Sequence, residues 1–155
     1  MPGTYSQMYI HIVFAVKGRQ RLIHPSWEEN LYRYITGIVT NKGQKLLAIN
    51  GMPDHIHMLI GMKPSCCLSD LVREIKKSSN EFIKENGFTD LHFNWQEGFG
   101  AFTCGYSQLD TVIAYIRRQK EHHRVKPYDE EFREFLETYQ IEYQEKYLFD
   151  AKKIN

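Results

Sequence analysis

The segment from position 54 to 60 constrains the fold more than any other, because its side chains alternate between two chemical characters. His55 and His57 flank one large apolar residue, and alternate side chains of a strand share a face, so their Cα atoms lie ~6.5 Å apart. Ile56, Met58 and Ile60 then point into the opposite, apolar layer. Two imidazoles on one rigid face can bind a metal ion and leave positions open for a substrate oxygen. An isolated His-x-His pair is more often structural or incidental.

A second pattern lies between positions 108 and 123, which the sequence predicts to be one continuous helix. The packed stripe of this helix follows i, i+3, i+4, i+7 and consists of Leu109, Val112, Ile113 and Ile116. Another stripe, rotated by ~100°, carries Tyr115, Gln119 and His122. A phenol and a carboxamide one turn apart can therefore face a common point beyond the helix. The alternative is that Tyr115 is a half-buried core aromatic and that Gln119 is simply solvated.

Alternating and helical periodicities follow one another along the chain in the order β-α-β-β-α-β-α. The predicted strands cover positions 9–16, 45–50, 54–60 and 99–104. Helices are predicted after Pro25, at 68–84 and at 108–123, followed by a short acidic-faced helix at 128–137. This order favours an α+β fold, a ferredoxin-like sandwich with helices on one face of an antiparallel sheet. The histidine strand is expected to be central in that sheet.

Length and composition indicate one ordinary globular domain. The 155 residues are expected to form a single domain, 1–155, to which the acidic segment 127–155 also belongs. No run of 18 apolar residues indicates a membrane span, and no charged-then-apolar leader indicates secretion. We therefore expect no membrane partner and a cytoplasmic location. Cys66 and Cys67 are adjacent and Cys104 is isolated, so neither a zinc knuckle nor a disulfide framework is suggested.

Charge is unevenly distributed, although the net charge is only +1. Residues 1–126 contain 16 Lys and Arg against 11 Asp and Glu, whereas residues 127–150 contain 2 against 8. A basic body with an acidic segment is compatible with DNA binding, in which phosphate contacts supply much of the affinity. The same distribution is equally compatible with ordinary solvated faces.

Two groups of cations are candidates for contacts with a nucleic-acid backbone. The first group runs along one side of the predicted helix 68–84 and consists of Arg73, Lys76, Lys77 and Lys84. The second group, Arg117 and Arg118, lies beside Tyr115. We expect both groups to contact DNA phosphates. For the first group the alternative is a solvated helix face.

Four blocks of sequence, in this order along the chain, resemble one known family. His55-Ile56-His57 matches the histidine–hydrophobic–histidine ("HUH") pattern, and Trp95-Gln96-Glu97-Gly98-Phe99-Gly100-Ala101-Phe102 is similar to the family's Trp-Gln-x-Gly-Tyr-Gly-Ala-Phe stretch. Tyr115-Ile116-Arg117-Arg118-Gln119 resembles the family's nucleophile helix, and Glu121-His122-His123 fits the segment that follows it. The chain is thereby identified as a member of the single-tyrosine HUH transposases of the insertion-sequence-200 type, with the REP-associated tyrosine transposases as close relatives.

The resemblance carries expectations about fold, chemistry and partners. It implies a ferredoxin-like, RRM-like sandwich whose nucleophile-bearing helix lies near the C-terminus. It also implies that Tyr115 forms a 5′-phosphotyrosine and that His55, His57 and Gln119 hold Mg²⁺ or Mn²⁺, although imidazoles alone equally suit zinc, nickel or iron. The implied substrate is single-stranded DNA with hairpins at the ends of a mobile element. The implied enzyme is a nucleoid-associated homodimer.

Three further residues stand near these motifs. Asp54 is expected either to orient a ligand imidazole or to cap the turn before the histidine strand. His122 shares the stripe of Tyr115 and is a candidate for a supporting role. His11 alternates with the apolar residues of the first strand and is expected to be structural.

Competing functions can be compared on particular residues. A histidine-triad nucleotide hydrolase needs a third histidine where this chain has Leu59, and a two-histidine phosphoesterase needs a pair of His-x-Ser/Thr motifs that this chain lacks. Domesticated repeat-associated transposases often carry Asn-Pro after the tyrosine segment, whereas Gln119-Lys120 favours the mobile-element type. A noncatalytic module that binds single strands through a ferredoxin-like sheet stays open as an alternative.

Overall fold

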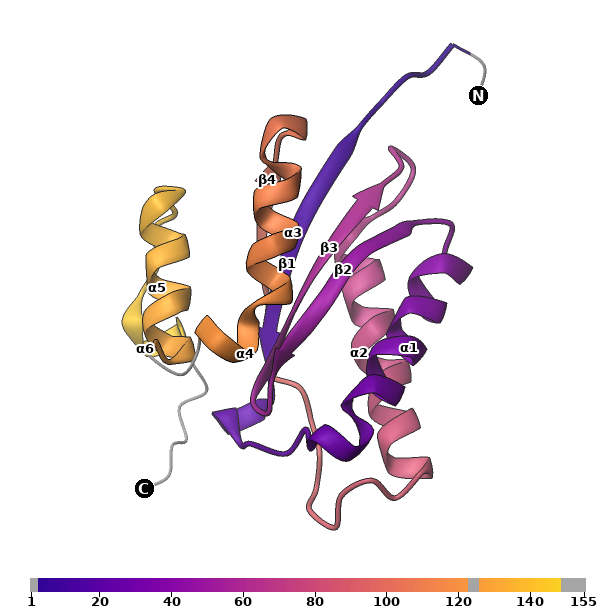
Figure 1. The fold of residues 1–155 in the computed structure, drawn as a ribbon, viewed down its shortest axis with the longest axis vertical. Helices are drawn as coiled ribbons and strands as arrows, with labels where there is room; N and C mark the ends of the chain where they lie inside the picture. The colour runs from indigo at the N-terminus through magenta and orange to yellow at the C-terminus, as the bar shows by residue number, and fades with distance from the viewer. Residues whose placement is uncertain (1–2, 123–125, 149–155) are drawn as a thin grey trace.

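Four antiparallel strands form a single sheet in the order β2-β3-β1-β4 in the computed structural model, which describes residues 3–122 and 126–148 (Figure 1). The strands are β1 (Met8–Ala15), β2 (Lys45–Met52), β3 (His55–Met62) and β4 (Gly100–Cys104). Each begins and ends within two residues of its predicted bounds. The histidine strand β3 pairs with β2 on one side and with β1 on the other, as expected for a central strand.

Helices lie on both faces of this sheet (Figure 1). One face is covered by α1 (Pro25–Asn41) and α2 (Leu68–Glu85), and the other by α3 (Leu109–Arg117), α4 (Gln119–His122) and α5 (Tyr128–Thr138). The short helix α6 (Glu145–Leu148) follows, and single 3₁₀ turns are formed by η1 (Lys17–Arg19) and η2 (Tyr106–Gln108). None of the helices described in residues 3–122 and 126–148 is long and apolar enough to cross a membrane.

The main hydrophobic core lies between the sheet and the pair α1 and α2. The two central strands contribute alternate side chains that are at most 1% exposed, namely Ile12, Phe14, Ile56, Met58 and Ile60. The helices contribute Leu31 and Ile35 from α1 and Leu71 and Ile75 from α2. Period-two alternation in the strands thus meets the apolar stripes of two amphipathic helices, which is what the sequence pattern predicts.

The opposite face carries two smaller apolar clusters instead of one continuous core. Val13 and Phe102 of the sheet pack with Tyr128 and Phe132 of α5, and Leu59 packs with Ile116 of α3. The ferredoxin-like α+β fold is therefore confirmed, with α1 and α2 as its helical layer. The tyrosine helix and α5 add a second layer on the face to which His55 and His57 point.

The predicted continuous helix 108–123 is wrong, because the helix breaks at Arg118. Arg118 has φ −97° and ψ 20°, and α4 starts anew at Gln119. Hydrogen bonds to the β2–β3 hairpin stabilise the break: Asn50 Nδ2 donates to Arg117 O at 3.0 Å, and Lys120 Nζ donates to Gly51 O at 2.8 Å. Gln119, the first residue of α4, is fully buried. Position 123, the predicted helix end, lies outside the described residues.

Gly51 explains how closely the β2–β3 hairpin is drawn together next to the histidine pair. A Cβ atom at this position would lie 2.2 Å from the backbone oxygen of His55 and 2.8 Å from the Cα atom of Ile56. Real Cβ atoms do not approach backbone atoms so closely, so only glycine fits without a shift of β3. The start of the histidine strand is therefore fixed by a close backbone contact.

Candidate metal and nucleophile site

The two histidines of β3 are buried side by side beneath α3 and α5. His55 is 1% exposed and His57 is fully buried, and their ring centroids lie 5.2 Å apart with an interplanar angle of 71°. Their neighbours Ile56 and Met58 face α1 and α2 instead. Both imidazoles therefore stand on a paired central strand, whose backbone fixes their spacing.

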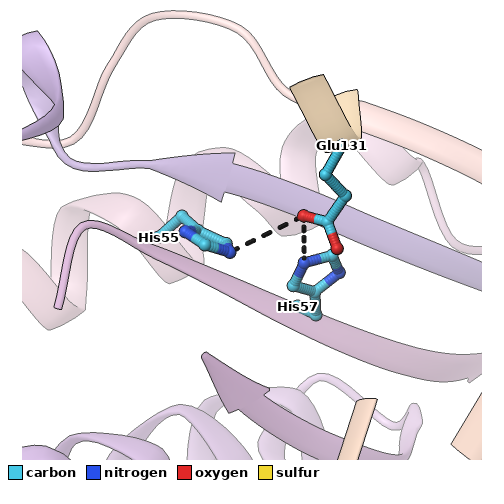
Figure 2. A group of neighbouring side chains, drawn as sticks. All are labelled: His55, His57 and Glu131. Carbon is cyan, nitrogen blue, oxygen red and sulfur yellow. Dashed lines mark hydrogen bonds and ion pairs between the residues drawn. The ribbon is translucent and has the colours of Figure 1, made fainter. Parts of the chain in front are cut away.

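Glu131 of α5 completes the pair (Figure 2). Its Oε1 lies 3.1 Å from His57 Nε2 and 3.7 Å from His55 Nε2, and the carboxylate is buried. Among the described residues these three form the group that could hold a metal ion, with one ligand atom from each lying within 4.8 Å of the others. Two imidazoles and one carboxylate are a donor set that suits a divalent transition metal such as Mn²⁺.

Sequence analysis missed Glu131, although a signal was present. The predicted acidic helix places three acidic residues in succession, and periodicity divides them between two faces. The stripe that packs onto the sheet follows i, i+3, i+4, i+7 and i+8 and consists of Tyr128, Glu131, Phe132, Phe135 and Leu136. A carboxylate within an apolar stripe needs a partner. That requirement singles out Glu131 from its acidic neighbours.

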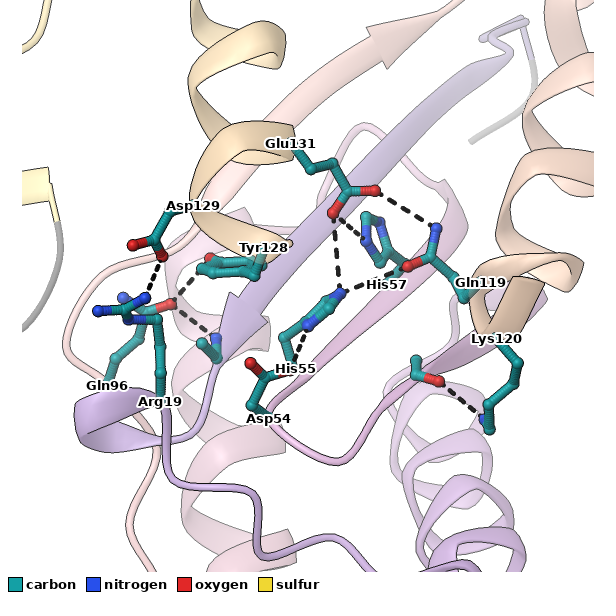
Figure 3. A network of polar contacts seen from close by, with 12 residues as sticks. Arg19, Asp54, His55, His57, Gln96, Gln119, Lys120, Tyr128, Asp129 and Glu131 are labelled. Carbon is teal, nitrogen blue, oxygen red and sulfur yellow. Dashed lines mark hydrogen bonds and ion pairs between the residues drawn. The ribbon is translucent and has the colours of Figure 1, made fainter. Parts of the chain in front are cut away.

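Gln119 lies at the edge of the same group (Figure 3). Its Oε1 lies 3.4 Å from His55 Nε2, and its Nε2 donates to Glu131 Oε2 at 3.4 Å. The sequence-predicted trio of His55, His57 and Gln119 is thus gathered in one place, together with a carboxylate that was not predicted.

Asp54 lies directly behind His55. Its Oδ1 is 2.7 Å from His55 Nδ1, on the side of the ring opposite to Glu131 (Figure 3). Burial alone would raise the pKa of Asp54, but the hydrogen bond to His55 and the positive charge of Arg21 hold this pKa below its usual value. For Glu131, burial and the negative charges of Asp54 and Glu134 raise the pKa to about 8.

His11 of β1, for which the sequence suggested a structural role, contacts this group through His57. Its Nε2 lies 2.9 Å from His57 Nδ1, and both rings are buried. Burial lowers the pKa of His11 to about 4, so this imidazole is neutral at physiological pH. No local pattern reveals this contact, because the two histidines are 46 residues apart in sequence.

Tyr115 lies beside His57 and borders a cavity between α3 and α5. The cavity has a volume of about 350 Å³, and its lining includes Tyr115, His11 and Glu131. The ring centroid of Tyr115 lies 5.7 Å from that of His57 and 6.2 Å from that of His11. The phenol is therefore next to the metal-ligand group and borders a space that is open to a substrate.

The cations of α2 lie on the opposite face of the sheet from this cavity. Arg73 pairs with Asp70, and Lys76 Nζ donates to Gln96 O at 2.8 Å and to Gly98 O at 2.6 Å. Lys77 and Lys84 are exposed. Lys76 thus holds the loop after α2 in place, while the other three cations border the solvent.

Arg117 and Arg118 are exposed at the end of the tyrosine helix. Arg118 and Tyr115 line a second cavity, of about 650 Å³, which lies along α3. This places one cation next to Tyr115. The side chain of His122, the remaining predicted supporting residue, lies outside the described part of the structure.

Residues 4–119 match the family described as transposase IS200 like. This match covers most of the chain and includes His55, His57, Tyr115 and Gln119. The protein belongs to the IS200-like transposase family. The matched residues end before α5, so Glu131 lies beyond them.

Curated relatives agree with this assignment. The chain is 27% identical over 117 residues to the transposase for insertion sequence element IS200 of Salmonella typhimurium, covering 72% of this chain and 76% of that one. It is 26% identical over 77 residues to the ISDra2 transposase TnpA of Deinococcus radiodurans, which covers 50% of this chain and only 55% of that relative.

Two solved structures share the fold. A candidate transposase from Deinococcus radiodurans R1 gives a TM-score of 0.61 at 22% identity, covering 77% of this chain and 95% of that one. A REP-associated tyrosine transposase bound to a REP hairpin gives a TM-score of 0.61 at 16% identity, covering 79% and 73%.

Proposed function

We propose that this protein is a DNA strand transferase that cuts and rejoins single-stranded DNA at the ends of a mobile element. The observation that carries the proposal is the shared cavity: Tyr115 and Glu131 line it together, and Glu131 is in contact with both His55 and His57. A nucleophile and a metal-ligand group can therefore act on one phosphate. Membership in the IS200-like family supplies the reaction class.

Tyr115 is the proposed nucleophile. Its phenolic oxygen attacks the scissile phosphorus, the bond from phosphorus to the 3′ oxygen breaks, and the departing 3′ oxygen takes up a proton. The products are a 5′-phosphotyrosine and a free 3′-OH. Because the phosphotyrosine ester conserves the bond energy, a second 3′-OH can reverse the step on another strand without ATP. An ordinary tyrosine has a pKa near 10, so forming phenolate at pH 7 costs about 4 kcal/mol unless the site assists.

His55, His57 and Glu131 are the proposed ligands of Mg²⁺ or Mn²⁺, with the Gln119 amide oxygen beside them. A bound divalent ion supplies Lewis acidity, which neutralises a non-bridging phosphate oxygen. The donor set fits such an ion, because the carboxylate and amide contribute hard oxygen atoms and the imidazoles contribute nitrogen. Two nitrogen ligands favour Mn²⁺ over Mg²⁺. Asp54 is proposed to hold the ring of His55 in its binding orientation through the 2.7 Å contact.

The proposed substrate is a single strand that carries a hairpin. A structural neighbour is bound to a REP hairpin, and the chain has no Gly-x-x-x-x-Gly-Lys loop with which to separate a duplex. Arg117 and Arg118 are proposed to hold phosphates next to the scissile bond. The exposed α2 cations, namely Arg73, Lys77 and Lys84, are proposed to contact DNA farther from the site. Lys76 holds the neighbouring loop through its hydrogen bonds to Gln96 O and Gly98 O. The proposal includes a homodimer associated with the nucleoid in the cytoplasm, and Gln119-Lys120 favours a mobile-element enzyme.

The experiment that tests this function compares one sequence in two forms. An end-labelled hairpin strand from the element's flank, and the same sequence as a fully paired duplex, are incubated with Mn²⁺ and resolved on a denaturing gel. We expect cleavage of the single strand, little cleavage of the duplex, and none in excess EDTA. Equal cleavage of both forms would indicate a double-strand nuclease, and binding without cleavage of either would indicate a noncatalytic module.

A further inference from the structure

His11 occupies an unusual position for a polar residue. It lies in the middle of β1, paired with Leu59 of β3 and Phe102 of β4, and it is only 4% exposed. Its ring is surrounded by aromatic rings, with Phe135 at 5.2 Å and Tyr115 at 6.2 Å between centroids. In this apolar setting its Nε2 makes a 2.9 Å contact with His57 Nδ1.

The chemistry of His57 determines the direction of this hydrogen bond in the metal-loaded protein. The Nε2 atom of His57 faces Glu131, at 3.1 Å, and is the atom that faces the proposed metal site. An imidazole that binds a metal through Nε2 must carry its proton on Nδ1. His57 Nδ1 is then the donor, and His11 Nε2 is the acceptor.

We propose that His11 is a positioning residue for the metal site, which fixes the tautomer and the ring orientation of His57. This inference rests on the proposed metal site and adds a residue to it. Metal-binding histidines almost always donate their second ring N–H to a partner that orients the ring. His55 has Asp54 at 2.7 Å from its Nδ1 atom, and His57 has the ring nitrogen of His11 at 2.9 Å from its own Nδ1 atom.

The two orienting partners differ in charge, for a physical reason. Asp54 lies at the start of β3 and is partly exposed, so it can remain ionised beside His55. His57 is deeper, and Glu131 already places a carboxylate against it. A second buried carboxylate there would add a large desolvation cost, whereas a neutral imidazole accepts the hydrogen bond without one.

If His11 were purely structural, different substitutions at position 11 would be tolerated. If the ring only filled space among Phe102, Phe135 and Tyr115, then Phe at position 11 would preserve its contribution. If His11 acts as an acceptor, then Phe fails, and Gln succeeds through its amide oxygen despite its different shape. His11→Phe keeps a ring and removes the acceptor, whereas His11→Gln keeps an acceptor and removes the ring, so the two substitutions separate these properties.

The experiment measures Mn²⁺ affinity by titration calorimetry, without DNA, for the wild type, His11→Phe and His11→Gln. We expect His11→Phe to weaken the affinity by about 10- to 100-fold, and His11→Gln to stay within about 3-fold of the wild type. His92→Phe, at an exposed histidine outside the site, is the matched control and should bind as the wild type does. Equal Mn²⁺ affinity in His11→Phe and the wild type would overturn the inference.

A second measurement needs no variant. Long-range ¹H–¹⁵N correlation spectra of the Mg²⁺-loaded wild type should show the His57 proton on Nδ1, and a proton on Nε2 would contradict the inference. A wild type that binds neither ion would instead overturn the proposed metal site, and the inference with it. Failure of the inference alone is distinguishable, because the wild type then binds Mn²⁺ and His11→Phe binds it equally well.

Discussion

The two faces of the central strands are equally buried but are held together by different interactions. On the face toward α1 and α2, Ile56 and Met58 pack into a continuous apolar core. On the face toward α3 and α5, His55 and His57 are just as inaccessible, yet each ring contacts polar side chains. The first face forms the main hydrophobic core, whereas the second carries the candidate metal ligands.

The two faces also differ in how far along the chain their partners lie. Contacts of the apolar face arise from periodic patterns, which any large aliphatic side chain of similar size can satisfy. Contacts of the polar face join specific residues that are 46, 64 and 74 positions apart. Buried polar networks tolerate little change, because a partner left unsatisfied costs free energy. Substitutions on the two faces should therefore affect different properties.

The largest expected effect is the loss of cleavage when a ligand histidine is removed. His55→Ala and His57→Ala should each reduce the cleavage rate by more than about 100-fold and remove tight Mn²⁺ binding, since each removes one of the few metal ligands. Affinity for hairpin DNA should change little, because phosphate contacts lie elsewhere. Rates from a denaturing gel and affinities from fluorescence anisotropy measure the two effects. Cleavage near the wild-type rate in either variant would remove the histidines from the mechanism.

Shortening a side chain on the other face of the same strand should lower stability and leave the cleavage rate of the folded protein unchanged. Ile56→Ala and Met58→Ala should each lower the free energy of unfolding by about 2–5 kcal/mol, because each leaves a cavity in the main core. The cleavage rate of the molecules that stay folded should remain near that of the wild type. Urea denaturation followed by circular dichroism measures the stability. A loss of Mn²⁺ binding larger than the loss of folded protein would show that the two faces are coupled.

Glu131→Gln should separate metal binding from stability on the polar face itself. We expect Mn²⁺ affinity to fall by about 10- to 100-fold, as for the loss of a charged ligand. The free energy of unfolding without metal should change little at pH 7, because a pKa of about 8 keeps Glu131 mostly protonated, and a neutral amide of the same shape then replaces a neutral acid. Glu130→Gln, at the exposed neighbouring position, is the matched control. Unchanged Mn²⁺ affinity would remove Glu131 from the ligand set.

The smallest expected effect concerns Lys120, which holds α4 against the β2–β3 hairpin. Its Nζ contacts Gly51 O and Glu28 Oε2, both at 2.8 Å. Lys120→Ala should lower the free energy of unfolding by about 1 kcal/mol or less, because these contacts are partly exposed. It should weaken Mn²⁺ binding only a few-fold, through a less well fixed Gln119. Lys45→Ala, at an exposed lysine of β2, is the control. If Lys45→Ala lowered the free energy of unfolding more than Lys120→Ala does, the contacts of Lys120 would not account for the loss.

The apolar face was predictable from the sequence, and the polar face only in part. Alternation in β1 and β3 and the apolar stripe of α2 predicted these three elements to within two residues, because these signals are local. Motifs predicted His55, His57 and Tyr115 as candidate site residues, and the structure places Tyr115 beside His57. The contacts of His11 and Glu131 depend on where distant elements pack, which one-dimensional periodicity does not encode. The break at Arg118 was missed for the same reason, since Asn50 and Lys120 stabilise it from outside the helix.

The most direct test of the central claim is to identify the residue that becomes attached to DNA. A single strand with a flanking hairpin is incubated with Mn²⁺, the protein is digested, and peptides carrying a 5′-phosphorylated nucleotide are located by mass spectrometry. The account predicts the modification on Tyr115, its absence in Tyr115→Phe, and its persistence in Tyr106→Phe, at an exposed tyrosine nine residues earlier. A denaturation-resistant adduct in Tyr115→Phe, or a modified peptide lacking Tyr115 in the wild type, would contradict it.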